Sequence, residues 1–232
     1  MVRVARFLQL GFGFSTHGGA RKGAGRPPNG ETAGVSHLAR PTLSRHHPVY
    51  VTLSVRRDVP TLRGSAMFRA VRSALAGARA RFSFRLVHFS VQRDHLHLLA
   101  EAQDRRALSR GIQGLSIRVA KAINRRLQRR GKVFADRYHS RALKTPRAAR
   151  YALRYVLLNA RKHERGSGGI PSGFADRCSS AAWFTGWSRP RELVFGLEKA
   201  EGDPPVVEPR TWLLRTGYRR VGPLDVDEGP GD

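Results

Sequence analysis

The chain has 232 residues, enough to bury one sizeable hydrophobic core, and 43 Lys and Arg against 17 Asp and Glu give it a net charge of +26. This charge favours a polyanion, above all nucleic acid, as partner over a membrane surface. A single cysteine, Cys178, excludes an internal disulfide and a cysteine-rich zinc site, and no apolar run approaches the roughly 18 residues of a membrane span.

The first 47 residues are predicted to form a basic and largely disordered N-terminal arm. The stretch His17–Pro28 is rich in glycine and cations and has no periodic apolar pattern. Its Gly25-Arg26-Pro27 resembles the core of an AT-hook, so the arm either contacts DNA phosphates and a minor groove or is simply a solvated extension. Its candidate DNA contacts are Arg21, Lys22 and Arg26.

The middle of the chain alternates between strand and helix patterns. Apolar residues at every second position predict strands, and apolar residues three to four apart predict helices. Asp94 lies in the turn between two of the strands, and Thr145-Pro146 is a strong helix start. The expected strands are 49–55, 82–92, 95–102 and 133–143, and the expected helices are 66–79 with Ser65 as its cap, 105–130 ended by Gly131, and one from 145 to about 163.

This order predicts an α+β fold, a ferredoxin-like (RRM-like) β-α-β-β-α-β sandwich with an antiparallel sheet and an added C-terminal catalytic helix. A catalytic domain is expected over residues 48–165. Residues 166–197 are expected to be a packed or partly ordered extension. Residues 198–232, with eight acidic and five basic residues, are expected to form an acidic mobile tail.

Two short stretches carry the candidate chemistry. On a strand, His95 and His97 point to one face, and on a helix Tyr155 and Asn159 lie side by side. Two imidazoles and an amide oxygen suit Mg²⁺ or Mn²⁺ better than structural zinc. A tyrosine beside such a metal can attack a polarised phosphate, which indicates a metal-dependent tyrosine nuclease.

The nucleophile is chosen among five tyrosines. Tyr151 and Tyr155 share a helical face, but an oxygen ligand, Asn159, follows only Tyr155 at four residues' distance. Tyr155 is therefore the expected nucleophile, with Tyr151 in reserve. Further candidate phosphate contacts are Arg118, Lys121, Arg125, Arg137, Arg141, Arg154 and Arg161.

These motifs together resemble the REP-associated tyrosine transposases, single-tyrosine transposases of the His-hydrophobe-His endonuclease superfamily. The matching stretches are His95–Leu99, Phe134–Leu143 with Arg137-Tyr138-His139, and Tyr155–Asn159. The resemblance implies that His95, His97 and Asn159 bind the metal and that Tyr155 cuts single-stranded DNA near hairpins. It further implies a 5′-phosphotyrosine intermediate and a free 3′-OH.

Two positions depart from the family pattern, in which Asn precedes the first histidine and Asn-Pro follows the tyrosine. This chain has Asp94 and Asn159-Ala160 there, and neither change removes a proposed ligand or the nucleophile. We expect a cytoplasmic, nucleoid-associated protein of prokaryotic type, acting as a monomer or homodimer. The alternative function is a non-catalytic single-stranded nucleic-acid binder, either RNA-recognition-like or a degenerate transposase relic.

Overall fold

A computed structural model describes residues 42–81, 83–159, 171–190, 193–195 and 204–229. Within these residues, no helix is long and apolar enough to cross a membrane. The expected contacts Arg21, Lys22, Arg26 and Arg161 lie outside the described residues.

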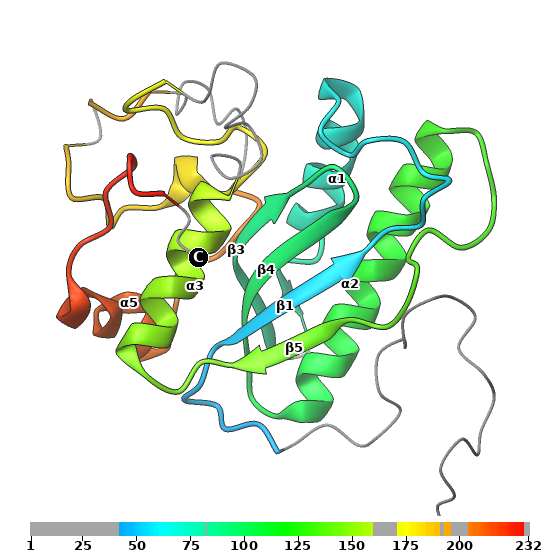
Figure 1. Cartoon of the computed structure of the whole chain (residues 1–232). Coiled ribbons are helices and arrows are strands. Elements are labelled where there is room, and N and C mark those ends of the chain that lie inside the picture. Colours follow the sequence, from blue (N-terminus) through cyan, green and yellow to red (C-terminus); the bar gives the residue numbers. More distant parts are fainter. Residues whose placement is uncertain (1–41, 82, 160–170, 191–192, 196–203, 230–232) are drawn as a thin grey trace, which may run out of the picture. The chain divides into compact units, whose positions relative to one another are not determined.

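The fold is built on one antiparallel sheet (Figure 1). Its strands lie in the order β2-β3-β4-β1-β5, so β4 and β1 are central, and the β-α-β-β-α-β order expected from the sequence is observed, with the short β2 added before β3. The strands are β1 (Val49–Ser54), β2 (Ala80–Arg81), β3 (Phe84–Val91), β4 (His95–Ala102) and β5 (His139–Ala142).

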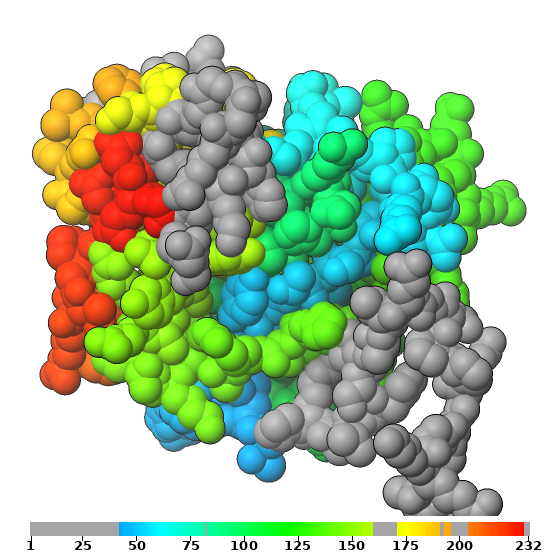
Figure 2. Space-filling view, in the orientation of Figure 1, coloured from blue at the N-terminus to red at the C-terminus, as the bar shows by residue number. Residues whose placement is uncertain are grey.

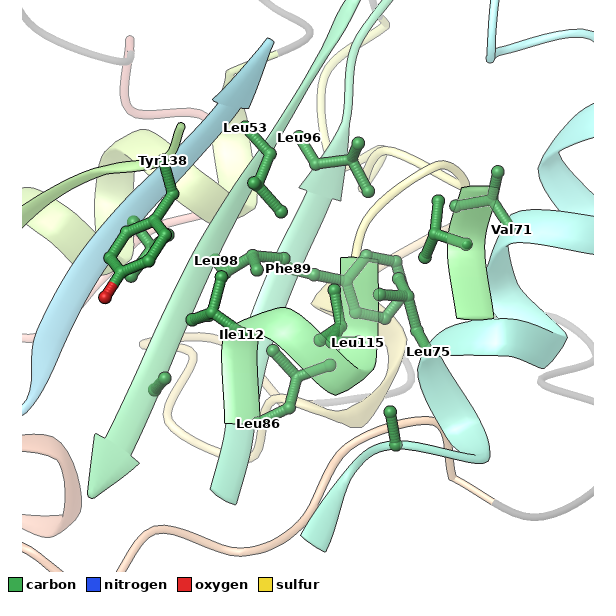
Figure 3. Packing of buried hydrophobic residues seen from close by; sticks show 14 of the residues in the cluster. Leu53, Val71, Leu75, Leu86, Phe89, Leu96, Leu98, Ile112, Leu115 and Tyr138 are labelled. Atoms are coloured by element: carbon green, nitrogen blue, oxygen red, sulfur yellow. The ribbon is translucent and has the colours of Figure 1, made fainter. Parts of the chain in front are cut away.

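Two helices, α1 (Ser65–Ala76) and α2 (Arg105–Arg126), cover one face of the sheet. Alternate strand residues meet the apolar stripes of these helices in the larger of two hydrophobic clusters (Figure 3). Burying one such Leu or Phe side chain contributes about 1.5–3 kcal/mol, which makes this cluster the main source of stability. Its central members include Leu53, Phe89, Leu96, Leu98, Val71, Leu75, Ile112 and Leu115.

The opposite face is covered by α3 (Pro146–Leu158). Thr145 caps this helix by accepting a hydrogen bond from the amide of Ala148, and proline occupies its first turn, as the sequence predicts. The buried side of α3, including Leu153 and Val156, forms a second cluster with Leu99 of β4. The sheet therefore lies between two layers, and the odd-numbered face of β4 looks toward α3.

Several element boundaries differ from the sequence prediction, among them the following three. The last strand is only β5, because the side chain of Asp136 accepts a hydrogen bond from the amide of Arg137 and turns the backbone before the ladder begins. Helix α2 ends before Gly131, because Gln128 already adopts a left-handed conformation with φ 50°. Helix α1 begins at Ser65 itself, so the expected serine cap is absent.

The expectation of a mobile tail from residue 198 is wrong for residues 204–229. They form α5 (Trp212–Arg215) and η3 (Gly217–Val221), and their apolar side chains Leu213, Leu214 and Tyr218 pack in the α3 cluster. In Figure 2 the surface of the C-terminal residues, in red, lies beside that of α3, in yellow-green. The acidic composition suggested a solvated segment, but α3 leaves an apolar surface that these residues cover. The segment is also held by arginines of α3.

Hydrogen bonds and ion pairs also fix this C-terminal segment. Arg150 donates hydrogen bonds to the carbonyls of Gly222 and Pro223 and pairs with the Glu228 carboxylate at 2.6 Å. The buried carboxylate of Glu101 accepts from the backbone amides of Arg210 and Thr211 and from the Thr211 hydroxyl. The segment 204–229 is thus an integral part of the layer on the α3 face.

Candidate active site

Strand β4 presents His95 and His97 on the face that looks toward α3. The intervening Leu96 and the following Leu98 are fully buried in the opposite cluster, which fixes the direction of both imidazoles. The His97 side chain is 4% exposed and His95 is half-buried, and their ring centroids lie 4.5 Å apart. The two histidines therefore lie in contact on one side of the sheet, as the strand pattern predicts.

The imidazole of His97 is held by strand β1. The Tyr50 hydroxyl lies 2.6 Å from His97 Nδ1, and the Thr52 hydroxyl lies 3.4 Å from the same nitrogen. Burial raises the pKa of Tyr50 to about 12, so its phenol is neutral at physiological pH. It can accept the Nδ1–H of His97, and in that tautomer Nε2 keeps the lone pair that a metal ligand needs.

His95 is oriented by its sequence neighbour. Its Nδ1 lies 2.7 Å from the Asp94 carboxylate, and this hydrogen bond lowers the pKa of Asp94 below its usual value. An ionised carboxylate only accepts, so the imidazole donates its Nδ1–H and a neutral His95 has its lone pair on Nε2. The departure from the family pattern at position 94 thus supplies a carboxylate that orients a candidate metal ligand.

Helix α3 brings Tyr155, and not Tyr151, against the histidines. The Tyr155 ring packs edge-on to His97 at 5.0 Å between centroids and to Tyr50 at 6.1 Å. Tyr151 is 48% exposed and lies under the guanidinium of Arg154, 5.0 Å from its ring centroid. The structure therefore places the expected nucleophile beside the candidate ligands and the reserve tyrosine at the surface.

Asn159 caps the C-terminus of α3, one turn beyond Tyr155. Its side chain is fully buried, and neither its amide oxygen nor its amide nitrogen has a hydrogen-bond partner among the described residues. A buried amide without partners is costly unless a ligand satisfies it. An oxygen directed to a metal would do so, and the donor set of two imidazoles and one amide oxygen fits Mg²⁺ or Mn²⁺.

No group of three or more His, Cys, Asp or Glu side chains within the described ranges could hold a metal by itself. A metal at His95 and His97 therefore depends on an oxygen from Asn159 or from the bound substrate. This requirement distinguishes the site from a closed structural metal site, which supplies every ligand from side chains.

A row of polar residues crosses the sheet through His97. In the register of the strands, Thr52 stands opposite both His97 on β4 and His139 on β5, and Ser90 of β3 stands on the other side of His97. Tyr50, Thr52 and Ser90 are not among the site residues that the sequence predicts. Alternation within β1 could have indicated that Tyr50 and Thr52 share a face, but only strand pairing shows which histidine they meet.

The arginines expected to contact phosphate fall into three groups. Arg141 stands opposite Tyr50 in the β1–β5 register and therefore faces the site, while Arg137 is exposed just before β5. Arg154 is instead taken up by the C-terminal segment, 3.8 Å from the Glu228 carboxylate. Arg118, Lys121 and Arg125 are exposed on α2, across the sheet from the histidines, so they do not line the site.

The buried His88 of β3 is unsuited to proton transfer. Burial lowers its pKa to about 3, its Nδ1 lies 3.1 Å from the Ser180 hydroxyl, and its ring packs on Phe184. His88 is therefore a neutral structural residue.

Comparison with known proteins points to one family. Residues 45–156 match the family model described as IS200-like transposase. Among solved structures, the chain is similar to a REP-associated tyrosine transposase bound to a REP hairpin, with a TM-score of 0.45 and 16% sequence identity over 55% of this chain and 74% of that chain. No curated protein matches the sequence.

Proposed function

Because residues 45–156 belong to the IS200-like transposase family, we propose that the chain is a metal-dependent endonuclease and strand transferase acting on single-stranded DNA beside hairpins. The observation that supports this most directly is the packing of the Tyr155 ring against His97. A candidate nucleophile and a candidate metal ligand, 58 positions apart in sequence, lie in contact. This is the arrangement that nucleophilic attack on a polarised phosphate requires.

In the proposed reaction, the Tyr155 phenol loses its proton to water, since its ring is half-buried and reaches solvent. Its Oη attacks the scissile phosphorus, and the bond from phosphorus to the 3′ oxygen breaks. The downstream strand is left as a 5′-phosphotyrosine, and the departing 3′ oxygen takes a proton from water, so the upstream strand ends in a free 3′-OH. The phosphotyrosine bond conserves the energy needed for rejoining, so no nucleotide hydrolysis is required.

Each of the other residues has a part in holding the reactants. When bound, a divalent ion would supply charge stabilisation at the non-bridging oxygens of the phosphate. His95, His97 and Asn159 would hold it, with Asp94 and Tyr50 fixing the two imidazoles through their Nδ1 atoms. Arg141, on the same face as Tyr50, would contact a neighbouring phosphate.

The test is a covalent-adduct assay with a hairpin oligonucleotide that carries a single-stranded flank and Mn²⁺. A 3′-labelled strand should stay attached to the protein under denaturing conditions, and a 5′-labelled strand should be released. Tyr155→Phe should abolish the adduct, whereas Tyr151→Phe should retain it as a matched control. An adduct that persists in Tyr155→Phe disproves the assignment of the nucleophile, and binding of the oligonucleotide without any adduct favours the non-catalytic alternative.

A further inference from the structure

A second cationic site lies at the other end of the sheet from the histidines. A groove of about 750 Å³ opens where β4 ends, next to the start of β3 and just before β1. Glu101, in its wall, follows His97 by four residues on the same strand, which corresponds to about 13 Å along the strand. The groove therefore does not overlap the contacts that define the candidate active site.

The lining of the groove is strongly basic. Arg45, Arg81, Arg85 and Arg210 contribute guanidinium groups, and among the residues that the structure describes Glu101 is the one acidic residue that lines it. Its carboxylate is compensated, because it pairs with Arg85 at 3.4 Å and accepts hydrogen bonds from the backbone of residues 210 and 211. The remaining guanidinium groups leave the groove attractive to an anion.

An aromatic ring stands at the edge of these cations. Trp212 lines the groove and is 49% exposed. It is fixed in place, because a Cβ on Gly217 would come within 2.8 Å of the indole, so the backbone there packs directly on the ring. The Arg220 guanidinium lies over the ring, 4.9 Å from its centroid, and adds a further cation at this edge of the groove.

We propose that this groove binds a segment of single-stranded DNA, with phosphates held by Arg81 and Arg210 and a base stacked on Trp212. Arginines that follow a backbone and an exposed aromatic ring that accepts bases are the combination by which proteins hold single strands. The volume suits one or two nucleotides, in the range of ordinary small-ligand sites. The chain's own N-terminal residues 1–41 are basic and do not complement the groove.

The groove goes beyond the proposed cleavage reaction, because it would hold DNA away from the phosphate that Tyr155 attacks. The protein would then bind the strand at two sites, one where the strand is cleaved and one where it is retained. The two ideas are separable, since binding in the groove requires neither a metal nor a nucleophile.

The test uses the full-length chain and a labelled 20-nucleotide oligo(dT) in a salt titration without metal. Arg81→Ala combined with Arg210→Ala should weaken binding at least tenfold and lower the slope of log K against log salt by about 1.4, or about 0.7 for each lost phosphate contact. The matched control is Arg57→Ala with Arg69→Ala, which removes the same charge from exposed positions outside the groove. Equal losses in the two double variants would show a general electrostatic field and overturn the proposal.

The stacking of a base on Trp212 is tested separately, by tryptophan fluorescence. Oligo(dT) should quench tryptophan fluorescence in the wild type, the quenching should disappear in Trp212→Phe, and Trp212→Leu should bind about fivefold or more weakly. Trp212→Phe keeps an aromatic ring against Gly217, so it remains a folded test protein even if the leucine variant does not fold. Unchanged quenching in Trp212→Phe, or tighter binding of the equivalent single-stranded RNA, would contradict the assignment. Tyr155→Phe protein should give the same binding results, so a failed adduct assay leaves this test intact.

Discussion

The Tyr50 hydroxyl lies 2.6 Å from Nδ1 of His97, joining the two central strands across the candidate active site. Hydrogen bonds of this kind behind a metal-binding histidine fix the ring and its tautomer. Through this contact, strand β1 takes part in the site without itself supplying a metal ligand or the nucleophile.

Removing the Tyr50 hydroxyl should weaken metal binding without removing a ligand. We expect Tyr50→Phe to shift the Mn²⁺ concentration at half-maximal adduct formation upward by about 10- to 100-fold, with activity recovering at high Mn²⁺. The measurement is a Mn²⁺ titration of the adduct assay. Tyr151→Phe, which removes a hydroxyl from the exposed tyrosine of α3, should leave the midpoint unchanged, and an unchanged midpoint in Tyr50→Phe would refute the role of this contact.

The buried histidine of β3 should make stability depend on pH. His88 has an unfolded pKa of 6.5 and a folded pKa of about 3, so the unfolded chain binds its proton first as the pH falls. The contribution of neutral His88 to the free energy of unfolding is fully present above about pH 6.5. It decreases by up to about 1.4 kcal/mol per pH unit as the pH falls toward 3. Urea unfolding between pH 7 and 4 should show a smaller decrease for His88→Gln.

The control for this prediction is His139→Gln, which changes an exposed imidazole. It should retain the pH dependence of the wild type, because its imidazole is solvated in both states. The same slope in His88→Gln and the wild type would mean that other groups cause the acid sensitivity.

Glu101 should anchor the C-terminal segment. Its carboxylate accepts hydrogen bonds from three donors, the amide of Arg210 and the amide and hydroxyl of Thr211, and Glu101→Gln places an amide NH₂ against some of these donors. We expect a loss of about 1.5–3 kcal/mol in the free energy of unfolding and faster proteolysis within residues 204–229. The exposed Glu208→Gln is the matched control and should change neither quantity.

Two glycines of α2 should respond oppositely to the same substitution. A Cβ on Gly111 would come within 2.1 Å of the Phe84 ring, so Gly111→Ala should destabilise the fold by about 1–3 kcal/mol. A Cβ on Gly114 meets nothing within 4 Å, so Gly114→Ala should stabilise by up to about 1 kcal/mol through helix propensity. Thermal or urea unfolding of both variants tests the packing of α2 on β3, and a stabilised Gly111→Ala would show that this packing is looser than described.

The sequence by itself determined the elements and the faces of the site. Alternation in β4 placed His95 and His97 on one side, because neighbouring leucines must enter the core. Thr145-Pro146 determined where α3 begins, and helical spacing put Tyr155 and Asn159 on one side of it. These properties depend on residues only a few positions apart, which is why local patterns reveal them.

Only the tertiary structure decided what these faces meet. The contact between Tyr50 and His97 depends on the register of two strands 47 positions apart, and no local pattern encodes that register. The same holds for Arg154, which pairs with Glu228, and for the cations of α2, which lie across the sheet from the site. An acidic composition suggested a mobile tail, but burial depends on the surface that another element leaves uncovered, and here α3 leaves an apolar surface that residues 204–229 fill.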